Sequence, residues 1–196
     1  MESKQTDLFG GAIKVELPTT LIDISQVRQV PDSQEVFILN SKDLEKPNDL
    51  SIIIEVLQKL STSSSFDSIR FHFDSLANDN SAQSSKILKT FNLNQTSATS
   101  TSSNPSTNHL TTPQPILLEG IQSVSKFNRP DSEADQVHIW MALWTLNGIG
   151  NNGLGTDLVL TMNLPNVSQP EVLEQTTKLF QLAAKTLQIV DWNLFA

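Results

Sequence analysis

The segment from Ser168 to Leu187 constrains the fold most, because it predicts a long helix with a broad apolar face. Pro170 suits a first helical turn, and Ser168 with Glu171 predicts a capping box. A face this wide must be buried against another layer of the protein. The positions that form it are Val172, Thr176, Leu179, Ala183 and Leu187, flanked by Leu173, Phe180 and Ala184.

Alternating and β-branched runs upstream of this helix predict the sheet that it covers. The last three runs follow one another closely, which favours an antiparallel meander. Apolar residues at helical spacing predict a helix at 51–60, and a weaker helix is expected at 78–91. The predicted strands are residues 12–17, 35–40, 69–73, 116–124, 137–146 and 158–164.

Together these elements predict an α+β fold. We expect an α/β/α sandwich with a mainly antiparallel sheet of about six strands flanked by helices. The 196 residues suffice for one core, so a single domain covering 1–196 is expected. Residues 94–115 contain eleven Ser or Thr and three prolines, and are expected to form a low-complexity surface loop within that domain. An interdomain linker is the alternative for this segment.

The block from Leu8 to Phe37 mixes turns, strand text and carboxylates. Gly10 and Gly11 suit a turn with positive φ. Asp23 is placed to cap the short turn 24–27, and Asp32 with Glu35 has the Asp-x-x-Glu spacing of a capping box. Arg28 has the i,i+4 spacing for an ion pair with Asp32. Alternatively, the three carboxylates form one acidic patch that attracts the basic side chains of a partner.

The same block resembles a known family. LFGGAI at 8–13, LIDIS at 21–25 followed by Arg28, and VPDSQEVF at 30–37 resemble, in order and spacing, the Ran guanine nucleotide release factor family. The resemblance continues through 51–60, 71–76, 156–165 and the tail VDWNLFA, but it does not cover the middle of the chain. It implies an α/β/α sandwich similar to the extrinsic PsbP-like subunit of photosystem II.

The resemblance also implies a function and a site. Members are small nuclear-import proteins that bind the GTPase Ran, so binding to GTP-bound or nucleotide-free Ran and release of its nucleotide are expected. The Asp and Glu of the family's P-D-x-Q-E motif, implicated in Ran binding, correspond to Asp32 and Glu35, with Asp23 as an accessory. We expect a non-catalytic monomer without a cofactor, in the nucleus and also the cytoplasm. An exchange factor or Ran-binding protein is a candidate further partner.

Charge and composition narrow the other options. A formal net charge of -8 argues against nucleic acid and against an anionic membrane surface as partners. The absence of cysteine excludes disulfides, thiol nucleophiles and thiolate metal sites. The N-terminus has no apolar signal-peptide core, and no apolar stretch approaches the roughly 20 residues of a membrane span.

Other motifs favour structural roles. Residues 148–153 spell G-x-G-x-x-G, but the residues that follow have the alternating pattern of a strand and not of a helix. A hairpin loop is therefore expected instead of a dinucleotide site. His72, His109 and His138 have no ligand spacing, and His72 and His138 lie in runs expected to be strands. Trp140 and Trp144 are expected in the core, with Trp192 more open. A generic binding scaffold for another protein or small ligand is the alternative function, and an enzyme with a metal or histidine site ranks third.

Overall fold

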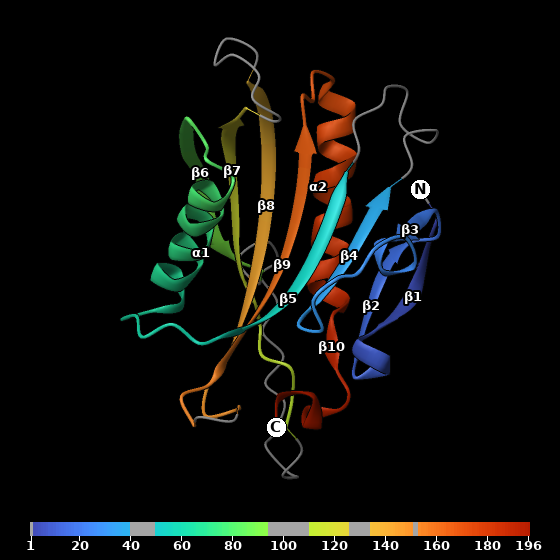
Figure 1. Cartoon of the computed structure of the whole chain (residues 1–196), viewed down its shortest axis with the longest axis vertical. Coiled ribbons are helices and arrows are strands. Elements are labelled where there is room, and N and C mark those ends of the chain that lie inside the picture. Colours follow the sequence, from blue (N-terminus) through green and yellow to red (C-terminus); the bar gives the residue numbers. More distant parts are fainter. Residues whose placement is uncertain (1, 40–49, 94–109, 126–133, 151–152) are drawn as a thin grey trace.

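The computed structural model describes residues 2–39, 50–93, 110–125, 134–150 and 153–196. Over these residues the main sheet has seven strands, every neighbouring pair antiparallel, in the order β3-β4-β5-β9-β8-β7-β6 (Figure 1). The predicted α+β class is confirmed, with one strand more in this sheet than expected. The strands are β3 (Leu21–Asp23), β4 (Gln34–Leu39), β5 (Ser51–Gln58), β6 (Ser84–Asn92), β7 (Ile116–Val124), β8 (Asp135–Leu146) and β9 (Thr156–Pro165).

A second, smaller sheet lies beside the first. It comprises β1 (Ser3–Leu8), β2 (Ile13–Pro18) and β10 (Gln188–Ile189), in the order β1-β2-β10. The β1–β2 hairpin turns through a short 3-10 segment, Phe9–Gly11, where Gly10 and Gly11 have φ of 65° and 96°. These two glycines therefore adopt the left-handed backbone predicted for them.

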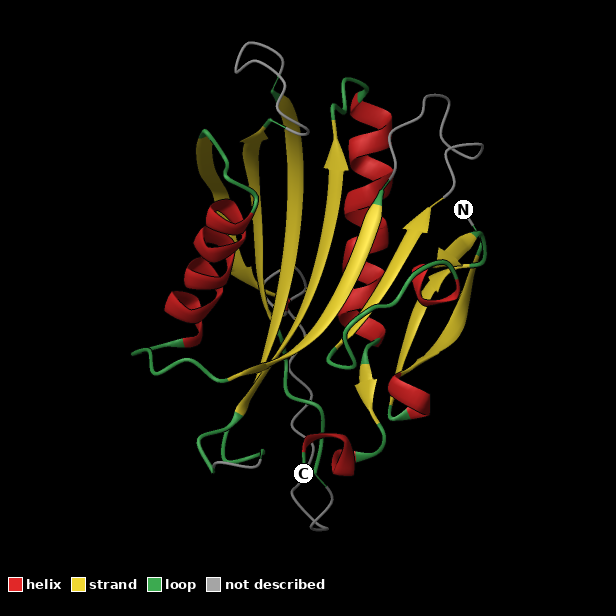
Figure 2. Ribbon diagram, in the orientation of Figure 1, coloured by secondary structure: helices red, strands yellow, loops and turns green. Residues whose placement is uncertain are grey.

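The two long helices cover opposite faces of the main sheet. Helix α1 (Ser65–Asp79) and helix α2 (Pro170–Thr186) lie on its two sides (Figures 1 and 2). Phe180, Ala183 and Ala184 of α2 join the small sheet and one sheet face in the larger core cluster. Ile69 and Phe73 of α1 pack on the other face. The predicted layer order, helix on sheet on helix, is thus observed.

The sequence of strand β8 is almost continuously apolar because this strand is buried on both faces. Trp140, Ala142 and Trp144 face the larger cluster, whereas Ile139 and Met141 face the α1 side. A central strand buried on both faces has no polar face to show. The predicted core positions of Trp140 and Trp144 are confirmed, since each is 1% exposed.

Two predicted elements between residues 51 and 73 are wrong. The predicted helix is a strand, and the predicted strand is part of a helix. The predicted helix 51–60 is strand β5, whose β-branched run Ile52–Ile54 favours a pleated surface. It lies between β4 and β9 and has apolar residues on both faces. Some of these residues also fall at helical spacing, which is why the segment was predicted to be a helix. The predicted strand 69–73 lies inside α1, and His72 is therefore helical. Ser64 caps this helix by accepting from the Asp67 backbone N–H.

Three further local predictions meet different outcomes. The weak helix expected at 78–91 is mostly β6, because α1 ends at the Asn80 cap and Ser81 takes a φ of 50°.

The predicted capping box of Ser168 and Glu171 is wrong. Gln169 is the N-cap of α2 and makes no side-chain cap bond, although Pro170 does begin the helix. Within the expected loop 94–115, residues 94–109 lie outside the described residues.

Strands β8 and β9 are joined by the glycine-rich segment that spells G-x-G-x-x-G. Gly148, Gly150 and Gly153 all have positive φ, and a strand follows them. The hairpin prediction is therefore confirmed for the described part of this connection. None of the helices in the described residues has the length and apolar character needed to cross a membrane.

Candidate partner-binding surface

Pairing of β3 with β4 brings two of the predicted site residues together. Asp23 is in register with Phe37, and Glu35 lies two residues earlier on β4. Side chains two apart on a strand share a face, so the carboxylates of Asp23 and Glu35 are diagonal neighbours. They line one open groove of about 580 Å³. The small sheet closes its other side, contributing Lys4, Thr6 and Asp7.

Glu35 has a structural partner that the sequence did not predict. Its Oε1 accepts a 2.6 Å hydrogen bond from the backbone N–H of Phe9. Phe9 has a φ of 50°, which is uncommon for a residue with a side chain. Glu35 therefore ties the strained turn of the β1–β2 hairpin to the main sheet. It lies within β4, so the predicted capping box of Asp32 and Glu35 is wrong.

Asp23 and Asp32 differ in whether their carboxylates have a partner among the described residues. Asp23 caps the 3-10 helix Ile24–Gln26, its Oδ1 accepting from the Ser25 N–H at 2.9 Å, as predicted. Asp32 is exposed in the turn before β4, and its carboxylate makes no hydrogen bond or ion pair to any described residue. The predicted Arg28–Asp32 ion pair is absent from the described part of the chain. Within the described part of the chain, Asp32 therefore has no contact that a partner would have to displace.

Apolar side chains accompany these carboxylates. Ile22 is 42% exposed beside Asp23, and Val27 is 73% exposed just beyond the capped turn. Sequence analysis missed both of them because exposure of an apolar side chain cannot be read from its spacing, and it missed Asp7 because only the position of β1 beside the β3–β4 edge brings Asp7 to the groove. We call Ile22, Asp23, Val27, Asp32 and Glu35 the acidic edge. Carboxylates around exposed apolar groups suit a protein partner with basic and apolar side chains.

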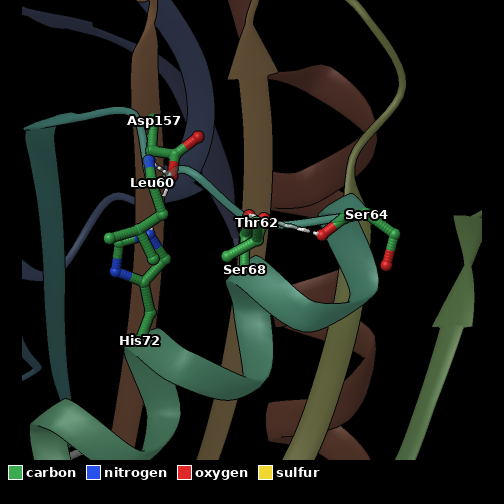
Figure 3. A network of polar contacts seen from close by, with 6 residues as sticks. All are labelled: Leu60, Thr62, Ser64, Ser68, His72 and Asp157. Carbon is green, nitrogen blue, oxygen red and sulfur yellow. Dashed lines mark hydrogen bonds and ion pairs between the residues drawn. The ribbon is translucent and has the colours of Figure 1, made fainter.

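The two histidines in the described residues are held by buried carboxylates. His72 Nε2 lies 3.0 Å from Asp157 Oδ2, which also accepts from the Leu60 N–H, and Figure 3 shows this network beside Thr62 and Ser68. His138 Nε2 lies 2.9 Å from Glu119 Oε1. No group of three or more metal-ligating side chains occurs within the described ranges. His109 lies outside them. Both described histidines therefore have structural partners, as expected.

Glu119 provides a pH-dependent prediction. Its hydrogen bond from His138 and the nearby Lys89 ammonium, at 2.6 Å from Oε2, hold the pKa of its carboxyl below the usual 4.5 despite burial. A depressed folded-state pKa stabilises the protein above pH 4.5, and that stabilisation is lost as pH falls through the folded pKa. Glu119→Gln should therefore lower the free energy of unfolding at pH 7 by about 1–3 kcal/mol. Urea unfolding at stepped pH should show this gap narrowing below pH 4.5; a constant gap would contradict the assignment.

An α+β sandwich that presents carboxylates and apolar side chains together at a sheet edge has the surface of a protein-binding module. The comparisons with known proteins define it further. The family model described as Ran-interacting Mog1 protein matches residues 6–165, and the chain belongs to this family. The matched span contains the whole acidic edge.

Similar proteins cover almost the full length of the chain. A Danio rerio protein named Ran guanine nucleotide release factor is 30% identical over 197 residues, covering 96% of this chain and 97% of its own. A Schizosaccharomyces pombe protein named nuclear import protein mog1 is 28% identical, covering 96% and 98%. The crystal structure of the Saccharomyces cerevisiae Ran-binding protein Mog1p has a TM-score of 0.72 at 24% identity, with both chains fully covered, which supports the fold.

Proposed function

We propose that this protein binds the small GTPase Ran and promotes release of its guanine nucleotide, thereby regulating transport between nucleus and cytoplasm. Membership of the Ran-interacting family supports the partner. The names of the Danio rerio and Schizosaccharomyces pombe relatives support nucleotide release and nuclear import. In this proposal one domain acts without a cofactor and catalyses no covalent step, in the nucleus and also in the cytoplasm.

The observation that carries the proposed site is the exposed carboxylate of Asp32, which has no partner among the described residues and lies three positions before Glu35 in the chain. We assign Asp32, Glu35 and Asp23 to Ran binding. Asp32 makes the most direct contact, because it has no hydrogen bond or ion pair to the described residues that would have to break. Glu35 contributes charge through the oxygen that Phe9 leaves unused, and Asp23 adds to the same negative field.

Nucleotide release follows from linkage between two ligands of Ran. If this protein binds nucleotide-free Ran more tightly than loaded Ran, then each ligand weakens the other by the same factor. A coupling of about 1–3 kcal/mol corresponds to a shift of about 5- to 150-fold. The carboxylates of the acidic edge would achieve this by engaging basic side chains near the nucleotide pocket of Ran, in competition with phosphate.

The decisive experiment follows fluorescent nucleotide release from purified Ran, with and without this protein. We expect the release rate to rise with the concentration of the protein and then to saturate. Binding to GTP-loaded, GDP-loaded and nucleotide-free Ran, measured side by side, should favour the nucleotide-free form. An unchanged release rate together with equal binding to all three forms would reject the proposal.

A further inference from the structure

A second pocket lies on the face of the sheet opposite the acidic edge. It lies between α1 and strands β5, β8 and β9, with a volume of about 190 Å³. Met141 and Val159 contribute apolar surface to its wall. Its polar lining comes from Glu55, His72, Ser75, Asp79 and Thr161.

One polar side chain of this pocket is buried and has no hydrogen-bond partner among the described residues. Thr161 is only 3% exposed and lines the pocket, yet its hydroxyl makes no hydrogen bond there. The His72 side chain is 9% exposed; its Nε2 meets Asp157, while Nδ1 is turned away from that carboxylate (Figure 3). Buried polar side chains are normally hydrogen-bonded, so the Thr161 hydroxyl offers an open position to a ligand.

The carboxylates that line or adjoin the pocket are acceptors. Asp157 Oδ2 accepts from the Leu60 N–H, and an ionised carboxylate has no proton to give, so Nε2 is the donor in the His72–Asp157 bond. The carboxylates of Glu55 and Asp79 accept as well. A ligand that satisfies these groups must bring several donors and positive charge.

Glu55 is placed to gain most from such a ligand. Burial is the main reason that the pKa of its carboxyl is raised above 4.5, and the nearby Asp79 raises it further. The Gln34 amide, which donates a 2.5 Å hydrogen bond, and His72 partly offset this effect. The negative charge of Glu55 is thus only partly compensated, and a bound cation would complete the compensation.

We propose that this pocket holds the cationic end of a lysine or arginine side chain from a partner protein. Its volume lies below the roughly 300–1,000 Å³ of sites for drug-sized molecules, but it suits one side chain. The apolar wall matches the methylene stem of that side chain, and the acceptors match its ammonium or guanidinium group. This site is separate from the acidic edge and does not depend on the proposed function.

Nuclear magnetic resonance titration of the full chain tests the proposal. The probes are butylammonium, butylguanidinium and capped lysine (Nα-acetyl-lysine-N-methylamide), with neutral n-butanol as the matched control. We expect saturable shifts at Thr161 and Val159 with the cations, at a Kd of about 1–10 mM. Equal shifts with n-butanol, or no saturable shift with any cation, would overturn the cation site. Binding of butylammonium without capped lysine would overturn the assignment to a protein side chain.

Substitutions make the test specific. The double variant E55Q/D79N should bind the cations at least tenfold more weakly, and T161V should weaken them by a smaller factor. None of these changes should lower the melting midpoint, because Glu55 loses a costly charge, Asp79 lies at the negative end of α1, and Thr161 loses an unpaired hydroxyl. D74N removes a charge from the exposed side of the same helix and should bind as the wild type does. Unchanged affinity in the double variant would overturn the proposal.

Discussion

Replacing Asp32 by lysine should weaken binding to Ran by about tenfold or more, which corresponds to about 1.4 kcal/mol. The reason is that Asp32 is exposed and makes no bond to the described residues, so reversing its charge acts on the partner and not on the fold. Surface charges steer association, so the loss should appear mainly in the association rate and should shrink at high salt. The melting midpoint should stay within the error of the measurement.

Glu35 requires a different design, because its carboxylate has two roles. Glu35→Gln keeps an oxygen that can accept from the Phe9 N–H but removes the charge, so Ran binding should fall while stability holds. Glu35→Ala leaves that part-buried N–H without its acceptor, which should reduce the free energy of unfolding by about 1–3 kcal/mol. Comparing the two substitutions separates the charge from the tether.

Asp74→Lys is the matched control for the substitutions of Asp32 and Glu35. Asp74 is an exposed acid on α1, across the sheet from the acidic edge, and its reversal changes the net charge by the same amount as Asp32→Lys. Equilibrium binding and association rates should be measured for each variant against nucleotide-free Ran. If Asp74→Lys weakens binding as much as Asp32→Lys does, net charge alone explains the loss and the acidic edge is not the site.

Local patterns predicted the acids of this edge but not their separate roles. Asp23 was expected to cap a turn and does so, since capping depends on neighbours two residues away. The bond from Phe9 to Glu35 joins positions 26 residues apart, and the groove exists only because β1 packs beside β4. Sequence spacing carries no information about such a contact. Assignment of Asp32 to a partner stays a prediction.

The fold class was predictable although two elements were assigned wrongly. Strands β8 and β9 and the broad apolar stripe of α2 were predicted correctly because their sequence patterns are long enough to be unambiguous. Residues 51–60 are apolar on both faces, so helical and strand periodicity fit them equally. Helix α1 has only Ser68, Ile69 and Phe73 buried, and its exposed Phe71 made the segment look like a strand. A narrow apolar stripe is a weak helical signal.

The narrow face of α1 makes Phe73 the anchor of that helix. Phe73 is fully buried among Leu118, Ile139 and Met141, so Phe73→Ala should lower the free energy of unfolding by about 3–5 kcal/mol. Phe71→Ala is the matched control, because Phe71 lies on the same helix but is 55% exposed. Its effect should stay within about 0.5 kcal/mol. Denaturant unfolding measures both changes.

Gly120 on β7 explains how Phe73 fits against the sheet. A Cβ at position 120 would lie 2.7 Å from Cε2 of Phe73 and 2.9 Å from the backbone oxygen of Lys86, which is too close for either atom. Gly120→Ala should therefore destabilise the protein by about 1–3 kcal/mol through overpacking. Removing the ring makes room for the added methyl group, so the double variant G120A/F73A should be more stable than the two single losses predict, by about 0.5–3 kcal/mol. Strict additivity would show that Gly120 is required for the backbone and not for the ring of Phe73.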